Sequence, residues 1–213
     1  MQGKLIVIEG TNSSGKQTQA DMLVNRLNQN GFNSERKSFP DYESPTGKII
    51  GECLLGKNKQ PLFFEGIDNV PPKVAALYYA ADRAYNIDKI KELLNSGINV
   101  ILDRYVESNM AYQAAKFDKT SDKINMLLWM EQLEFNLLDL PRPDKVIFLY
   151  LPYEYRKDKD EYSKNIKNAE MVYSLMAERY GFEIINCIKN DEIRTIEDIH
   201  EEIYYNVHKY LVK

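Results

Sequence analysis

The chain has 213 residues, of which 44% are hydrophobic, and it carries a formal net charge of −4 with a pI near 5.4. Such a chain can bury one core with at most a small lid, so we expect a single domain over residues 1–213 without the basic face of a nucleic-acid binder. Its first apolar run is four residues long, far short of a signal-peptide core or a membrane span, so we expect a cytoplasmic protein with no membrane partner.

The first predicted elements are a strand, a loop and a helix that together form a phosphate-binding site. Residues 5–8 are an apolar run typical of a buried parallel strand. The run leads directly into G-T-N-S-S-G-K over residues 10–16, which has the G-x-x-x-x-G-K spacing of a phosphate-binding loop, and a helical pattern follows. The backbone N–H groups of such a loop, the helix N-terminus and the Lys16 ammonium all attract a polyphosphate. The residues assigned to this site are Gly10, Asn12, Ser13, Ser14, Gly15, Lys16, Gln17 and Thr18.

The position after the lysine departs from the usual motif. It normally holds Ser or Thr, whose hydroxyl binds Mg²⁺, but here it is Gln17, and a hydroxyl comes only at Thr18. A glutamine carbonyl can bind Mg²⁺ or one of its waters. We therefore expect a magnesium-dependent site with Gln17 and Thr18 near the metal.

Apolar runs and helical patterns alternate through the rest of the chain. Further strands are predicted over residues 33–39, 98–103, 145–151 and 182–188. Helices are predicted near residues 16–30, 71–96, 121–139, 161–180 and 195–211. Strands that alternate with helices form a parallel sheet covered on both faces, and ligands bind at the carboxyl ends of its strands. The predicted fold is therefore α/β, a five-stranded parallel sheet flanked by helices, in which the loops after residues 8, 38 and 103 meet.

One predicted helix indicates self-association. The helix near 121–139 is apolar on more than one side, with Leu128, Trp129 and Leu137 spread around it. A helix of this kind is either deeply buried or part of a subunit interface. In so small a protein we favour the interface and expect a homodimer through this helix.

A second group of functional residues follows the predicted strand that ends at residue 103. Asp103 stands where phosphate-loop enzymes put the acid that holds or orients the Mg²⁺ shell. The guanidinium of Arg104 comes next and can bridge two phosphate groups while a phosphoryl group moves between them. Polar side chains then continue at helical spacing: Ser108, Asn109, Tyr112 and Gln113.

Four short motifs give the chain a specific resemblance. They are D-R-Y-V at 103–106 with S-N at 108–109 and A-Y-Q at 111–113, F-P-D-Y at 39–42, L-Y-Y-A-A-D-R at 77–83, and L-P-R-P-D at 140–144. Together they resemble the thymidylate kinase family of P-loop nucleoside monophosphate kinases, and the F-P-D-Y turn is similar to that of some bacterial-type members. The resemblance covers residues 3 to about 151 and returns near 170–203. Between them, about 153–167 is similar to the family's lid but looks shorter.

The resemblance implies an ATP-dependent phosphoryl transfer to dTMP, giving dTDP and ADP for dTTP synthesis. Lys16 would contact the β- and γ-phosphates of ATP. Arg104 would lie between the donor and acceptor phosphates, and Asp103 would act on the Mg²⁺ shell. Arg156 is the expected lid cation, which makes these four the expected catalytic residues, and Arg194 is expected beside adenine.

The same resemblance implies a dTMP site. Tyr79 would stack on the thymine, while Arg83 and Asn109 would hydrogen-bond the base edge. Tyr105 and Tyr112 would crowd the sugar 2′ position and so favour deoxyribose. The full set implied for dTMP is Phe39, Tyr42, Tyr79, Arg83, Arg104, Tyr105, Ser108, Asn109, Tyr112 and Gln113.

Two departures from the family pattern leave other functions open. Many members have Asp where this chain has Asn12, and Gln17 replaces the usual hydroxyl residue. With the short lid, these changes would fit a nucleotide-binding homologue that has lost turnover. A deoxynucleoside kinase is the other alternative, and it needs a general base for a neutral hydroxyl, for which Asp41 is a candidate. The arginines expected around the phosphates favour an acceptor that is already phosphorylated.

Overall fold

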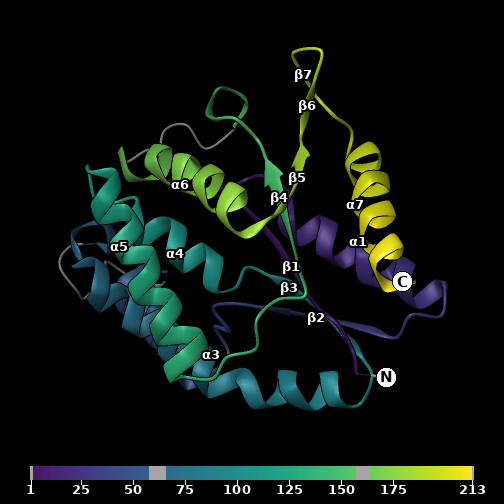
Figure 1. Ribbon diagram of the computed structural model, residues 1–213, viewed down its shortest axis with the longest axis horizontal. Helices are drawn as coiled ribbons and strands as arrows, with labels where there is room; N and C mark the ends of the chain where they lie inside the picture. The colour runs from purple at the N-terminus through teal and green to yellow at the C-terminus, as the bar shows by residue number, and fades with distance from the viewer. Residues whose placement is uncertain (1, 58–65, 157–163, 213) are drawn as a thin grey trace.

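A computed structural model describes residues 2–57, 66–156 and 164–212 (Figure 1). In these residues, five strands form one parallel sheet in the order β2-β3-β1-β4-β5. The strands are β1 (Leu5–Gly10), β2 (Ser34–Ser38), β3 (Asn99–Asp103), β4 (Lys145–Tyr150) and β5 (Glu183–Asn186). The predicted five-stranded parallel sheet is confirmed.

The register of the sheet brings three loops to one edge. Ile8 of β1 pairs with Asp103 of β3, and Ser38 of β2 pairs with the same residue. Because the strands are parallel, their carboxyl ends lie side by side and the loops that follow them meet, as predicted. β1 lies in the middle of the sheet between two helical layers, which is why all six of its residues are buried.

Helices cover both faces of the sheet (Figure 1). Successive strand side chains alternate between faces, so that Ile6 of β1 packs against α1 and α7, whereas Leu5 packs in the layer formed by α3 to α6. The helices are α1 (Lys16–Gln29), α2 (Pro45–Ile49), α3 (Pro72–Asn95), α4 (Val106–Ala114), α5 (Thr120–Glu131), α6 (Lys164–Tyr180) and α7 (Ile196–Leu211). The prediction that helices flank both faces is thus confirmed.

Several short elements were not among the predicted strands and helices, including α2, α4 and a hairpin after β5. α2 begins after Ser44, whose side chain accepts a hydrogen bond from the Gly47 N–H at 3.0 Å, and Pro45 occupies its first position. Ser followed by Pro is typical of a helix start, but a helix of only five residues shows no hydrophobic periodicity that would reveal it. After β5, the two-residue strands Ile188–Lys189 (β6) and Glu192–Ile193 (β7) form an antiparallel hairpin. The predicted strand over 182–188 therefore ends early.

The helix predicted near 121–139 consists of two parts. α5 ends at Glu131 and continues as a π-helical segment over Gln132–Leu137. α5 buries Met126, Leu127 and Met130, while Leu128 remains 43% and Leu137 70% exposed. The homodimer expected through this helix stays a prediction.

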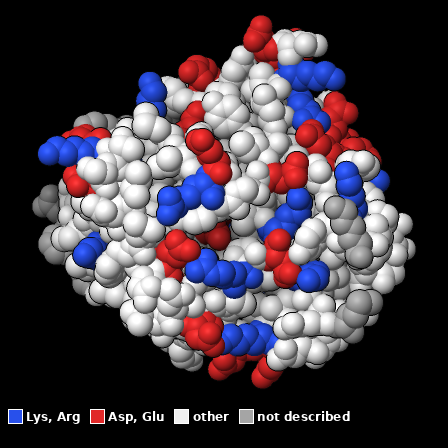
Figure 2. Space-filling model, in the orientation of Figure 1, with Lys and Arg blue, Asp and Glu red and all other residues white. Residues whose placement is uncertain are grey.

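The described surface carries charges of both signs, as expected from the small net charge of the chain. On the face shown in Figure 2, Lys and Arg side chains are interspersed with Asp and Glu. Among the described residues, no helix combines the length and apolar character needed to cross a bilayer.

Helix α4 buries a carboxyl group whose protonation should set the pH dependence of stability. Glu107 is 5% exposed, and its Oε2 has no hydrogen-bond partner among the described residues. Burial, and secondarily the charge of Glu9, raise the pKa of Glu107 from 4.5 to about 8. Between these two values the folded chain holds a proton that the unfolded chain has released, so the free energy of unfolding falls as pH rises.

Glu107→Gln should remove this dependence. We expect the variant to gain roughly 3 kcal/mol in unfolding free energy relative to wild type between pH 5 and pH 8. Urea denaturation at both pH values measures the unfolding free energies of wild type and variant. The matched control is Glu178→Gln, because Glu178 is exposed. Parallel pH profiles for wild type and Glu107→Gln would show that Glu107 is ionised in the folded chain.

Candidate active site

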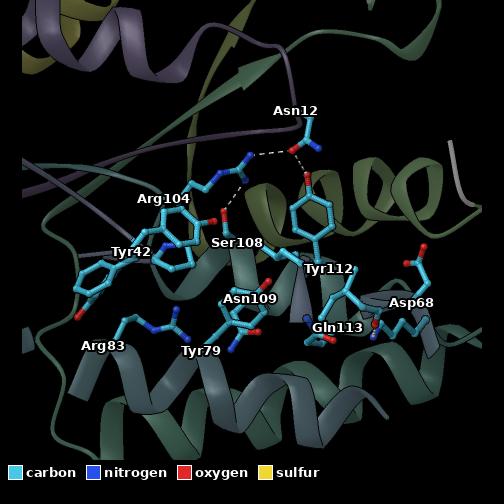
Figure 3. A pocket seen from close by; sticks show the side chains of 16 residues that line it. Asn12, Tyr42, Asp68, Tyr79, Arg83, Arg104, Ser108, Asn109, Tyr112 and Gln113 are labelled. Carbon is cyan, nitrogen blue, oxygen red and sulfur yellow. Dashed lines mark hydrogen bonds between the residues drawn. The ribbon is translucent and has the colours of Figure 1, made fainter. Parts of the chain in front are cut away.

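A cavity of about 410 Å³ opens where the loops after β1, β2 and β3 meet (Figure 3). All ten residues expected around the acceptor line it: Phe39, Tyr42, Tyr79, Arg83, Arg104, Tyr105, Ser108, Asn109, Tyr112 and Gln113. Six more lining residues complete the wall: Asn12, Pro40, Leu55, Ile67, Asp68 and Lys116. Of these, only Asn12 was expected at the site, as part of the phosphate-binding loop. The structure therefore brings the predicted set together in one cavity and joins it to that loop.

Arg104 stands between the loop and the cavity. Its φ of 68° lies in the left-handed region, which is uncommon for a residue other than glycine and typical of functional sites. Its guanidinium donates to Asn12 Oδ1 at 2.8 Å and to Ser108 Oγ at 3.1 Å, and the Tyr112 hydroxyl donates to the same Asn12 oxygen at 3.0 Å (Figure 3). Burial alone would lower the pKa of Arg104, but the tyrosines and carboxylates around it raise the pKa, so the group stays cationic.

Glu9 organises this region and was not predicted. Its carboxylate, fully buried at the end of β1, accepts the backbone N–H groups of Tyr105 and Ser108, both at 3.0 Å. It also accepts the Ser108 hydroxyl at 2.7 Å and the Tyr173 hydroxyl at 2.8 Å. Tyr105 is the residue before α4 and Ser108 lies in its first turn, so the Glu9 carboxylate caps the N-terminus of α4 from a neighbouring strand. A carboxylate inside the apolar run I-V-I-E-G was the signal in the sequence.

The phosphate-binding loop wraps around Lys16. Lys16 is 6% exposed, and its ammonium donates to Thr11 O at 2.6 Å and lies 3.5 Å from Ser14 Oγ. Burial, and secondarily the positive charge of Arg104, lower the pKa of Lys16 to about 7. A polyanion in the loop would restore the charge of Lys16, because it would supply the negative partner that the buried ammonium needs.

The opposite end of the cavity presents unpaired acceptors. The Asn109 amide nitrogen donates to Ala76 O and to Glu134 Oε1, both at 3.1 Å, which fixes the orientation of its side chain. Asn109 Oδ1 and Gln113 Oε1 are buried without a partner among the described residues. Since a buried acceptor without a donor is costly, this end of the cavity favours a ligand with N–H groups.

Arg83 is held by a buried ion pair. Its guanidinium donates through Nε and Nη2 to the two carboxylate oxygens of Glu134, and both side chains are almost fully buried. Glu134 was not predicted, because it is one of several carboxylates in 121–139 and the sequence does not indicate which of them has a buried partner. The pair holds Arg83 at the wall of the cavity, beside Asn109 (Figure 3).

Aromatic side chains form the remaining wall. Tyr79 is partly exposed at the cavity, and burial of its hydroxyl raises its pKa above the usual value. Phe39 is 5% exposed and packs against the Tyr105 ring at a centroid distance of 5.8 Å. Tyr105 is fully buried, and its hydroxyl donates to Pro141 O at 3.1 Å. Flat apolar surfaces beside unpaired acceptors suit a planar heterocycle.

Asp103 lies beside this cavity in a charged group of its own. Its Oδ2 is 3.3 Å from Arg36 Nη2, and Arg36 also pairs with Asp21 at 3.2 Å. No group of three or more His, Cys, Asp or Glu in the described parts of the chain could hold a metal ion alone. Asp103 carries a carboxylate, and the exposed residues Gln17 and Thr18 carry neutral side-chain oxygens, so all three offer hard-oxygen donors. Such donors fit Mg²⁺, which proteins hold with one or two carboxylates plus substrate phosphates.

Two further expected residues, Arg156 and Arg194, also lie outside the cavity lining, and both are held by ion pairs. Arg156 is buried, donates to Leu151 O at 2.9 Å, and pairs with Glu170 at 2.7 Å. Arg194 donates to Asn186 O at 2.8 Å and pairs with Glu202 at 2.6 Å. Residues 157–163 of the predicted lid lie outside the described residues.

Comparisons with known proteins agree with this geometry. A family model described as thymidylate kinase matches residues 8–203. The chain is 31% identical to a thymidylate kinase of Plasmodium falciparum, over 99% of this chain and 92% of that protein. It is 33% identical to a probable thymidylate kinase of Methanocaldococcus jannaschii, over 93% and 92%. The solved thymidylate kinase of Candida albicans superposes with a TM-score of 0.72 at 27% identity, covering 98% of this chain and 92% of that one.

These matches extend over nearly the whole chain and favour a monophosphate kinase over the deoxynucleoside kinase left open above. The bacterial type indicated by the F-P-D-Y turn stays a prediction. The sheet, the phosphate-binding loop and the cavity beside Arg104 are those expected from the motifs. The chain belongs to the thymidylate kinase family.

Proposed function

We propose that this chain transfers the γ-phosphoryl group of ATP to dTMP, giving ADP and dTDP for dTTP synthesis. One observation carries the proposal: Arg104 joins a phosphate-binding loop to a cavity with an aromatic wall and unpaired acceptors. The loop suits the polyphosphate of ATP, and the cavity suits a nucleoside monophosphate whose base is planar and carries an N–H group.

Arg104 is the group that stabilises charge during transfer. Its hydrogen bonds from the guanidinium go to two neutral side chains, Asn12 and Ser108, and no carboxylate of the described residues lies within ion-pair distance of it. The positive charge is therefore available to the donor and acceptor phosphates. Phosphoryl transfer depends on positioning and charge stabilisation more than on covalent help, so a fixed guanidinium at this place is effective.

The phosphate-binding loop would hold the donor. Backbone N–H groups of the loop and the Lys16 ammonium would bind the β- and γ-phosphates of ATP. Asp103, Gln17 and Thr18 would hold Mg²⁺. Bound magnesium neutralises phosphate charge and acts as a Lewis acid.

The cavity would hold dTMP in a defined direction. The thymine would stack on Tyr79, with Phe39 on the opposite side. Its N–H would donate to the unpaired Asn109 oxygen, and its carbonyl oxygens would accept from Arg83. Tyr112 and Tyr105 would border the sugar, and Tyr42, Ser108 and Gln113 would complete the site.

The remaining assignments are part of the same proposal. Arg156 would supply the lid cation, and Arg194 would lie beside adenine. The exposed Leu128 and Leu137 support a homodimer through residues 121–139. The cytoplasm is the proposed location, in keeping with the acidic composition.

A coupled ADP-release assay with several acceptors tests the function. MgATP would be combined in turn with dTMP, dUMP, dCMP, dGMP, dAMP and thymidine. We expect turnover selective for dTMP. Turnover of thymidine without dTMP would indicate a nucleoside kinase, and binding of dTMP without any ADP would indicate a homologue that has lost catalysis.

Tyr79→Ala should separate the two substrates. We expect dTMP to bind roughly tenfold or more weakly, because the variant loses a stacking surface worth about 1–3 kcal/mol, while the affinity for ATP stays near the wild-type value. Isothermal titration with each nucleotide measures the effect, with Tyr79→Phe as the control that keeps the ring. Unchanged dTMP affinity in Tyr79→Ala would mean that the ring serves only packing.

A further inference from the structure

One wall of the cavity is held by Lys116, which belongs to none of the sequence motifs and has no role in the proposed reaction. Lys116 lies just beyond the end of α4 and lines the cavity. Its ammonium donates to Ile67 O at 2.7 Å and to Val70 O at 2.8 Å. Ile67 and Asp68 belong to the 3-10 turn Ile67–Asn69 and also line the cavity. Lys116 therefore ties this turn to α4 across about 50 residues of sequence.

Helix α4 extends along the cavity. Near its start, Ser108 contacts Arg104 at the phosphate end, and further along, Asn109 and Gln113 present their unpaired oxygens. Lys116 follows Gln113 by three residues. Figure 3 shows Asp68 beyond Gln113, on the side of the cavity away from Arg83 and Tyr42. The turn thus closes the cavity beyond the acceptors proposed for the base.

Holding the turn requires partial removal of Lys116 from water. Burial lowers the pKa of Lys116 to about 8, and the neighbouring Asp68 opposes this shift. The ammonium is directed at two backbone carbonyls, and a charge-assisted hydrogen bond is stronger than a neutral one. Val70, at the far side of the turn, is buried against Ile50, Leu54 and Ala75, so the turn is fixed at both ends.

We propose that Lys116 is a positioning residue that sets the length of the base pocket and thereby excludes purine monophosphates. This inference rests on the proposed function, because it assigns the wall to the base of the acceptor. On this proposal, the wall beyond the Asn109 and Gln113 oxygens leaves room for a pyrimidine and obstructs the second ring of a purine. Lys116 binds the turn Ile67–Asn69, and on this proposal the turn, not Lys116 itself, contacts the base.

Lys116→Met tests the proposal, because it keeps the length of the side chain and removes the charge. The measured quantity is kcat/KM for dTMP divided by kcat/KM for dGMP. We expect this ratio to fall at least tenfold through the KM values, with KM for ATP unchanged. Lys116→Arg should restore most of the ratio, and the exposed Lys119→Met is the matched control.

A second variant guards against a folding defect. Ile67→Ala shortens the wall and leaves Lys116 in place, so it should lower the same ratio. Thermal melting shows whether each variant is folded. An unchanged ratio in folded Lys116→Met and Ile67→Ala would overturn the inference.

Failure of the proposed function can be distinguished from failure of the inference about Lys116. Wild-type protein that does not phosphorylate dTMP would contradict the function. The ratio of dissociation constants for dTMP and dGMP would then still decide the role of the wall. Wild-type protein that binds neither nucleotide would overturn both proposals.

Discussion

Replacing Arg104 by alanine is expected to lower kcat by roughly 10²–10³-fold, as the loss of a preorganised donor to a transition state does in other enzymes. The guanidinium is fixed by Asn12 and Ser108 and has no carboxylate partner in the described residues. Arg83 is the other arginine among the described residues that line the cavity, and its charge is neutralised by Glu134. KM for both nucleotides should change much less than kcat, because the interaction strengthens as charge develops.

Steady-state ADP release at saturating dTMP measures this loss. Arg104→Lys should be intermediate, because it keeps the charge and loses the planar fork that can bind two phosphates. The control is Arg142→Ala, which should retain activity, because the Arg142 side chain is 54% exposed and lies away from the cavity lining. A loss of tenfold or less in Arg104→Ala would mean that another cation bridges the phosphates.

Replacing Glu134 by alanine should reduce the free energy of unfolding by about 3–5 kcal/mol, because it leaves the Arg83 charge buried and unpaired. The same change releases the Asn109 amide from one of its two acceptors. Both groups face the proposed base, so any folded fraction should also bind dTMP more weakly. Urea denaturation measures the stability, and titration with dTMP measures the affinity.

A partly exposed ion pair from the same segment provides a matched control for the buried pair. Glu131 pairs with Arg142 at 3.0 Å near the surface, and Glu131→Ala should cost at most about 1 kcal/mol. The double variant Arg83→Leu/Glu134→Leu should recover much of the lost stability without recovering dTMP binding, since it removes both buried charges. Equal losses in Glu134→Ala and Glu131→Ala would contradict the account of the buried pair.

The sequence was most informative where function is encoded locally. The phosphate-binding loop is a continuous motif between a strand and a helix, and its geometry follows from glycine placement and the helix N-terminus. Ser108, Asn109, Tyr112 and Gln113 recur at helical spacing, so one helix brings them all to the cavity. Such patterns need no knowledge of distant contacts.

Residues whose role depends on a distant partner could not be recognised. Glu9 meets Ser108 across 99 positions, and Glu134 meets Arg83 across 51. Lys116 serves a turn almost as far away. Each is one charged residue in an apolar or mixed segment, and the sequence does not indicate what it binds. Buried charge satisfaction is a property of the folded chain.

The most direct test of the central claim is identification of the product by ³¹P NMR. Wild-type protein would be incubated with ATP, Mg²⁺ and dTMP, and the spectrum followed with time. The account predicts that dTDP and ADP appear in equal amounts while ATP and dTMP decline. A spectrum in which dTMP persists while the protein still binds it would contradict the proposed transfer.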